Sequence, residues 1–180
     1  MQKIVSVLIA VALCVVAALF CFIIPQGQNT KIFRLHIRAN SNLAVDQEVK
    51  MQIKEDFVEF LTPLVASCTT KEQVIAMCLK VLGQLDNIAN NVLISEGFNY
   101  TANTKVCNEY FPERMYGDKT VPCGYYDALI CELGEAQGDN WWCVVYPPLC
   151  FAGGDCINVQ YKSKIQEIIA WFFRQEGDLS

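Results

Sequence analysis

The stretch KIFRLHIRANSN, residues 31–42, carries the signals for a first strand and for the turn that ends it. Apolar side chains at positions 33, 35 and 37 alternate with basic ones at 34, 36 and 38, which is the period of a half-buried β-strand. Residues 39–42 break the alternation and offer Asn and Ser side chains, which favour a helix N-terminus. We therefore expect a strand with one apolar and one basic face, followed directly by a helix.

Two amphipathic helices are predicted next. The first extends to about Leu64, with apolar residues at helical spacing, and Pro63 and Ser67 mark its end. The second begins at Thr70, which opens a capping-box pattern, and closes at Gly97. Both apolar faces are expected to pack on a sheet.

The second half of the chain is dominated by strand patterns. Runs at 104–111, 125–133 and 141–146 read as strands, 134–140 as a turn, and about 161–174 as a last helix. Neighbouring strands are expected to pair antiparallel, with the first strand in the same sheet. The predicted fold class is therefore α+β: a small antiparallel sheet packed with about three helices, in the order β-α-α-β-β-β-α.

A hydrophobic segment precedes this fold. Residues 4–24 carry no charge and are long enough to span a bilayer, and Lys3 before them favours a signal sequence or an anchor with its N-terminus inside. Few small residues follow at 20–27, which favours an uncleaved anchor over a cleaved signal. The expected organisation is a transmembrane or signal segment at 1–24, a linker at 25–30, an exported domain at 31–175 and a tail at 176–180.

Charge and motifs exclude several classes of function. Without Lys3 the chain has 13 basic and 19 acidic residues, a net charge of −6, which argues against a nucleic-acid partner. His36 is the only histidine, and no Cys-x-x-Cys, Gly-x-Ser-x-Gly or nucleotide-binding loop occurs. We therefore predict no catalytic set, no metal site and no cofactor.

The stretch NWWCVVYPPLCF, residues 140–151, allows two interpretations. Its aromatic side chains could close the core of a small domain. Alternatively, prolines could stiffen a loop that presents anchor residues to a partner protein. Cys143 and Cys150 could close this loop as a disulfide. The residues of the expected partner-binding surface are Trp141, Trp142, Tyr146, Pro147, Pro148 and Leu149.

Five segments resemble stage II sporulation protein R of endospore-forming bacteria. They are RLHIRANS (34–41), DQEVKMQIKEDFVEFL (46–61), YFPERMYGDKTVPCGYYDAL (110–129), GEAQGDNWWCVVYPPLCF (134–151) and YKSKIQEII (161–169). The resemblance covers about residues 31–170. Within it the family-motif residues are Arg34, His36, Asn40, Ser41, Asp46, Tyr116, Gly117 and Asp118. The high cysteine content departs from the family pattern.

The resemblance implies a signalling protein rather than an enzyme. Family members are exported from the forespore, across its membrane, into the space between forespore and mother cell. There they are needed by a membrane-embedded aspartic protease of the mother cell that processes the precursor of sigma factor E. The alternative is an extracytoplasmic hydrolase whose product is the signal, with Asp46, His36 and Asn40 as the first residues to suspect.

Overall fold

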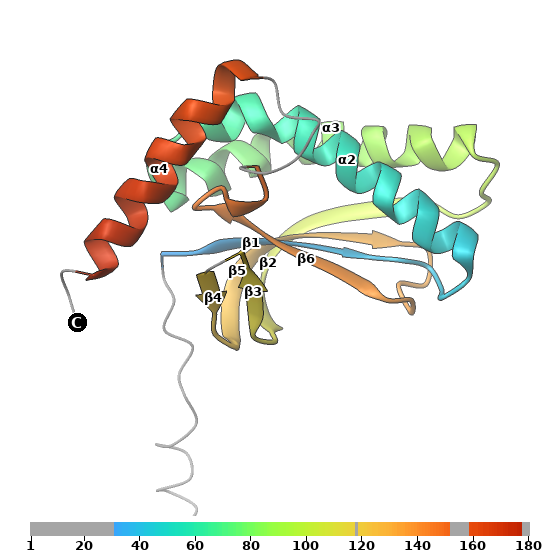
Figure 1. Cartoon of the computed structure of the whole chain (residues 1–180). Helices are drawn as coiled ribbons and strands as arrows, with labels where there is room; N and C mark the ends of the chain where they lie inside the picture. Colours follow the sequence, from blue (N-terminus) through green and yellow to red (C-terminus); the bar gives the residue numbers. More distant parts are fainter. Residues whose placement is uncertain (1–30, 118, 152–158, 178–180) are drawn as a thin grey trace, which may run out of the picture.

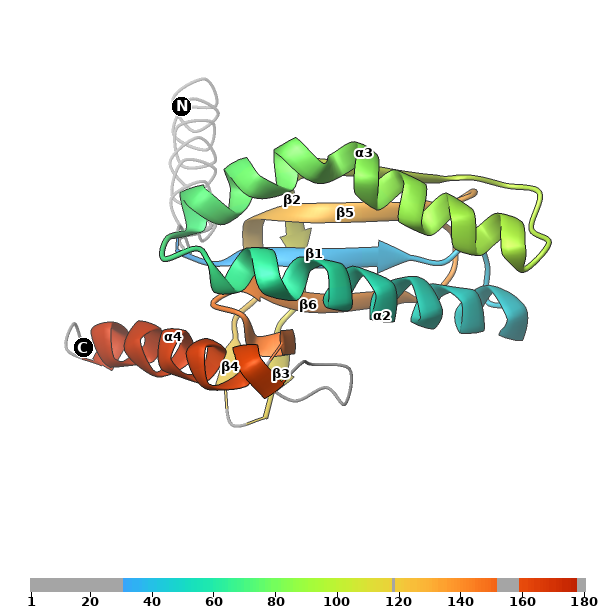
Figure 2. The same ribbon diagram turned by 90° about the horizontal axis from the view of Figure 1, so that it is seen from above.

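A computed structural model describes residues 31–117, 119–151 and 159–177 of the chain. It has an α+β fold, with three helices and a four-stranded mixed sheet in the order β2-β5-β1-β6 among these residues. The elements are β1 (Phe33–Arg38), α2 (Ala44–Ala66), α3 (Lys71–Ser95), β2 (Ala102–Phe111), β3 (Arg114–Tyr116), β4 (Lys119–Val121), β5 (Gly124–Leu133), β6 (Asn140–Tyr146), the 3-10 turn η1 (Leu149–Phe151) and α4 (Val159–Gly177). Helices α2 and α3 lie side by side over one face of the sheet (Figures 1 and 2).

The prediction of an antiparallel sheet was wrong for the central strand. β1 pairs with β5 in parallel, with Leu35 opposite Leu129, and with β6 antiparallel, with Leu35 opposite Cys143. β5 and β6 follow one another in sequence but do not pair, because β1 lies between them. The antiparallel pairing of β2 with β5 agrees with the prediction.

The loop between β5 and β6 explains how β1 enters the sheet. This loop passes over the end of β1, where Gln137 and Gly138 donate backbone hydrogen bonds to the carbonyls of Asn40 (3.1 Å) and Ala39 (2.9 Å). The six residues from 134 to 139 are therefore a bridge over one strand rather than a tight hairpin turn. A two-residue turn would have forced β5 and β6 to pair directly.

The β3–β4 hairpin was not predicted. Its strands have three residues each, too few for an alternating pattern to be recognised, and Gly117 turns the chain with a positive φ of 62°. The hairpin forms a separate two-stranded sheet, which lies on the side of the main sheet away from α2 and α3 (Figure 1).

The core lies between the sheet and the two helices. Phe33, Leu35 and Ile37 point into it and are fully buried, as the alternation predicted. Helix α2 ends at Ala66 with Ser67 as its C-cap, so Ser67 marks the end as predicted, whereas Pro63 does not end the helix and is tolerated on its exposed side. The cap of α3 is as predicted, because Thr70 accepts a hydrogen bond from the backbone N–H of Gln73 (3.3 Å).

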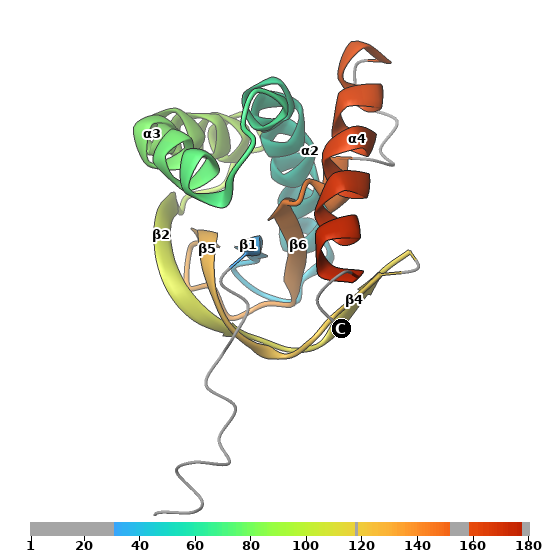
Figure 3. The same ribbon diagram turned by 90° about the vertical axis from the view of Figure 1, so that its left-hand side faces the viewer.

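Helix α4 packs beside the rest of the domain near α2 and the end of β6 (Figure 3). It runs slightly beyond both ends of the predicted helix. The expected membrane-spanning segment at 4–24 and the linker at 25–30 lie outside the described residues. None of the helices that the structure describes combines the length and apolar composition of a membrane span.

Candidate functional site

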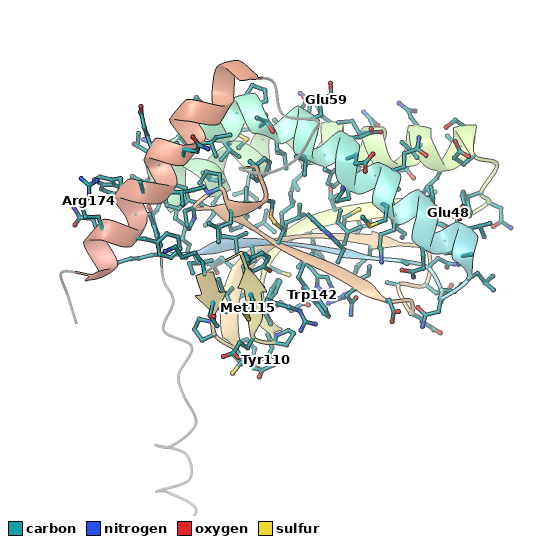
Figure 4. All side chains as sticks on the ribbon, viewed as in Figure 1. Glu48, Glu59, Tyr110, Met115, Trp142 and Arg174 are labelled. Atoms are coloured by element: carbon teal, nitrogen blue, oxygen red, sulfur yellow. A yellow bond between two sulfur atoms is a disulfide. The ribbon has the colours of Figure 1, made fainter. Side chains whose placement is uncertain are left out.

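The face of the main sheet that is turned away from α2 and α3, here called the outer face, carries both family-motif residues of β1, Arg34 and His36. Arg34, His36 and Arg38 alternate with the core residues and therefore point to this side. Trp142 of β6 lies on the same side, as does Met115 of the hairpin (Figure 4). The outer face is therefore the first place to look for a function.

Arg38 joins two carboxylates across the outer face. Its guanidinium donates to Glu109 of β2 and, at 2.6 Å, to Glu132 of β5, and Lys105 donates to Glu132 at 2.7 Å. Burial raises the pKa of Glu132, but Lys105 and Arg38 more than offset this, so its pKa lies below the ordinary value. These half-buried charges are paired with one another and link β1, β2 and β5.

His36 lies at the centre of the outer face and is 3% exposed. Its ring packs against Trp142 (5.4 Å between centroids) and Phe111 (5.6 Å). Burial lowers its pKa, so the ring is neutral at pH 7, and Nδ1 lies 3.0 Å from the carboxylate of Glu109, which it binds as a donor. Nε2 is buried and has no hydrogen-bond partner among the described residues.

Arg34 is fully buried under the β3–β4 hairpin. Its Cζ lies 4.3 Å from the ring centroid of Phe111 and 5.1 Å from that of Tyr126, and Nη2 donates to the hydroxyl of Tyr116 (2.8 Å). Nε and Nη1 are buried without an acceptor. Burial lowers the pKa of Arg34, yet a guanidinium stays charged in proteins. The described chain thus surrounds a positive charge with aromatic rings and gives it no carboxylate.

Three other family-motif residues, Asn40, Ser41 and Asp46, form a different cluster, at the start of α2. Asp46 is 2% exposed and accepts hydrogen bonds from Ser41 (2.5 Å), Tyr100 (2.5 Å) and Asn40 (3.0 Å). Burial raises the pKa of Asp46, but these hydrogen bonds outweigh burial and lower it overall. Both oxygens of this carboxylate are therefore occupied by structural contacts.

The same segment also anchors the β5–β6 loop. Asn40 accepts from the backbone N–H of Glu135 (2.9 Å), and Asn42 from that of Asp139 (2.6 Å). The prediction that these side chains cap α2 was wrong, because the N-cap residue is Leu43 and no side chain caps it. Their contacts are nonetheless structural, since they tie the end of β1 to α2 and to the loop.

The residues suspected for a hydrolase are not brought together. Asp46 and Asn40 bind each other at the end of β1, whereas His36 faces Glu109 on the outer face. The described residues also contain no group of three or more His, Cys, Asp or Glu side chains that could hold a metal ion.

The NWWCVVYPPLCF stretch combines both interpretations of its sequence. Tyr146, Pro147 and Pro148 are buried, so they are not part of an exposed anchor surface. Tyr146 instead donates to the carbonyl of Thr69 (2.6 Å) and packs on Phe172 of α4. Its burial reflects the position of α4, which lies on the end of β6.

The tryptophans and the 3-10 turn of this stretch remain partly accessible. Trp141, Trp142 and Leu149 are half-buried, and the guanidinium of Arg114 lies 4.2 Å above the ring of Trp142. The Cα atoms of Cys143 and Cys150 lie 6.0 Å apart, which is within the range that a disulfide spans, and the bridge between them stays a prediction.

The hairpin carries family-motif residues and adds one candidate, Arg114, that the sequence analysis did not identify. Tyr116 binds Arg34 and Gly117 makes the turn, while Asp118 lies outside the described residues. Arg114 was missed because nothing in the sequence places residue 114 over Trp142. Glu109 and Phe111 could have been found, since the alternation along β2 puts them on one face.

Comparisons with known proteins agree on one family. The family model "Stage II sporulation protein R (spore_II_R)" matches residues 29–155. Stage II sporulation protein R of Bacillus subtilis (strain 168) is 33% identical over 130 residues, which are 71% of this chain and 58% of the relative. The chain thus aligns with less than two thirds of that protein's length. No solved structure matches the chain.

Proposed function

The chain belongs to the stage II sporulation protein R family, and from that premise we propose that it is an exported sporulation signal that activates a membrane-embedded aspartic protease. The protease is that of the mother cell, and its substrate is the precursor of sigma factor E. Residues 4–24 would carry the chain across, or anchor it in, the cytoplasmic membrane, with the domain from residue 31 onward in the space between forespore and mother cell.

The arrangement of the outer face supports binding rather than catalysis. The observation that carries this is the buried, incompletely bonded guanidinium of Arg34, because such a group is suited to recognising an acceptor. The residues suspected for hydrolysis are engaged elsewhere in separate clusters. A protein that activates by binding must bind the active state of its partner more tightly than the inactive state.

Reconstitution in a non-sporulating bacterium tests this function. The full chain is produced together with the protease and the sigma factor E precursor, and processing is followed by immunoblot. We expect processing only when the chain is present and exported, and none when residues 4–24 are deleted so that the chain stays in the cytoplasm. Equal processing with and without a well-produced, exported chain would rule out activation.

A further inference from the structure

The guanidinium of Arg34 lacks acceptors that a buried cation normally has. Nε and Nη1 are buried without a hydrogen bond, and no ion pair joins Arg34 to a described carboxylate. Buried charges in proteins are almost always paired, because removing a charge from water is costly. The attraction between the guanidinium and the surrounding aromatic rings offsets only part of that free-energy cost. The position therefore suits an acceptor that the described chain does not supply.

The geometry of the guanidinium shows how such an acceptor would fit. A planar guanidinium offers two edges with paired donors, Nε with Nη2 and Nη1 with Nη2, and both edges include Nη2. The hydroxyl of Tyr116 accepts from one of the two N–H groups of Nη2, at 2.8 Å. A carboxylate that replaced this hydroxyl would bind two N–H groups at once, which is the strongest arrangement available to arginine.

The cover over Arg34 is attached to the domain by side chains rather than by strand pairing. The β3–β4 hairpin pairs only with itself, and within the described residues its backbone donates or accepts no hydrogen bond to the main sheet. Side chains hold it in place: Tyr116 contacts Arg34, Arg114 contacts Trp142, Lys119 lies 4.9 Å from the ring centroid of Phe173 in α4, and Val121 is buried. Two-stranded hairpins of this length are barely stable alone. Opening it would expose Arg34 and leave the main sheet intact.

We propose that Arg34 is a covered binding site for a carboxylate of the partner protein, and that the β3–β4 hairpin, through Tyr116, closes this site until that carboxylate displaces it. The identity of the partner rests on the proposed function, whereas the carboxylate site does not. Arg114 adds a second cation at the rim that no described carboxylate pairs with. At the buried position itself there is one guanidinium, which matches the single charge of a carboxylate better than the charge of a phosphate, about −1.5 to −2 at pH 7.

Binding of acetate to the full-length protein in detergent tests the site directly. The Nε–H signal of Arg34 is followed by NMR and is assigned by its loss in Arg34→Met. Tyr116→Phe removes the hydroxyl that occupies Nη2. We expect acetate, against sodium chloride at equal ionic strength, to shift this signal saturably in Tyr116→Phe and more weakly in the wild type.

Thermal unfolding provides an independent measurement of the same binding. Acetate should raise the melting temperature of Tyr116→Phe but not that of Arg34→Met. The inference is overturned if acetate neither shifts the signal nor raises the melting temperature of folded Tyr116→Phe. Tighter binding of inorganic phosphate than of acetate would overturn the assignment to a carboxylate.

The role of the site toward the partner is tested by processing in the reconstituted system. Arg34→Met should fold at least as stably as the wild type, because it removes an unpaired buried charge, yet lower processing about tenfold or more. Arg34→Lys should fail similarly, because an ammonium cannot bind with two parallel donors. The exposed Arg174→Met is the matched control and should process normally.

These outcomes separate the two proposals. If wild-type chain gives no processing, the proposed function fails, while acetate binding still decides the carboxylate site. If wild type and Arg34→Met process equally, Arg34 does not bind the partner.

Discussion

Asp46 holds together the residues that follow the first strand. It accepts hydrogen bonds from Ser41, Tyr100 and Asn40, and almost none of its surface is exposed. Asp46→Asn keeps the shape but removes the charge and turns one acceptor into a donor. We expect a loss of about 1–3 kcal/mol in the free energy of unfolding, measured by urea denaturation at pH 7.

The lowered pKa of Asp46 also predicts a dependence on pH. Because its folded pKa lies below the ordinary value, the charged form stabilises the fold above pH of about 4, and this contribution is lost as the pH falls further. The stability difference between wild type and Asp46→Asn should therefore shrink between pH 6 and about pH 3. A difference that stays constant or grows on acidification would contradict this account.

At the scale of single residues, the sequence predicts the face of the sheet to which a side chain points better than it predicts how deeply that side chain is buried. The alternation in 33–38 correctly placed Arg34 and His36 on the face opposite the core. It could not show that Arg34 is buried, because the covering residue, Tyr116, lies 82 positions away in a hairpin too short to recognise. The Asn and Ser side chains at 40–42 likewise suit the capping of a helix. In the structure they bind the carboxylate of Asp46 and the backbone of the 134–139 loop instead.

Among the elements, the β5–β6 loop depends on a close approach of backbones. A Cβ atom at Gly138 would lie 2.2 Å from the carbonyl oxygen of Ser41. Gly138→Ala should therefore force the loop away from the end of β1 and cost about 1–3 kcal/mol.

Gly83 provides the matched control for this prediction. It lies within α3 on the exposed side, and nothing would lie within 4 Å of an added Cβ. Gly83→Ala should stabilise the fold by about 0.5–1 kcal/mol, so the melting temperatures of the two variants should move in opposite directions. A melting temperature for Gly138→Ala at or above that of the wild type would show that the loop does not depend on this contact.

The buried and half-buried aromatic residues of β6 should behave differently. Tyr146→Ala empties a core position against α4 and should cost about 3–5 kcal/mol. Trp142→Ala removes a half-buried ring between His36 and Arg114 and should cost only about 1–2 kcal/mol while lowering processing. Circular dichroism with denaturation measures both costs. Equal losses of stability would show that Trp142 is a core residue only.

The elements themselves were largely predictable, and their order in the sheet was not. Periodicity located three helices and four strands, because each has a long enough apolar pattern. The position of β1 between β5 and β6 is set by hydrogen bonds from the 134–139 loop to residues 39 and 40, which local patterns do not contain. The parallel pairing of β1 follows from that loop.

On the scale of the whole molecule, the two faces of the domain differ in kind. Glu48 and Glu59 lie on α2, over the sheet, whereas Trp142, Met115 and Tyr110 lie on the opposite side (Figure 4). Met115 and Tyr110 are exposed there, at 72% and 53%. On the outer face a partner would therefore meet Arg114 beside Trp142 and the exposed Met115, while Arg38 and Lys105 are already paired with Glu109 and Glu132.

The comparison of one change on each face tests most directly whether the outer face is the signalling surface. Met115→Asp puts a negative charge beside Arg114 on the hairpin, where it would repel an incoming carboxylate. Leu79→Asp makes the same kind of change at an exposed apolar residue of α3. Both side chains are largely in solvent, so both variants should fold.

Processing of the sigma factor E precursor is measured for each in the reconstituted system. We predict that Met115→Asp lowers processing about tenfold, as expected for a lost contact of about 1.4 kcal/mol, while Leu79→Asp processes like the wild type. Normal processing by Met115→Asp together with loss in Leu79→Asp would contradict the account and place the signalling surface on the helices.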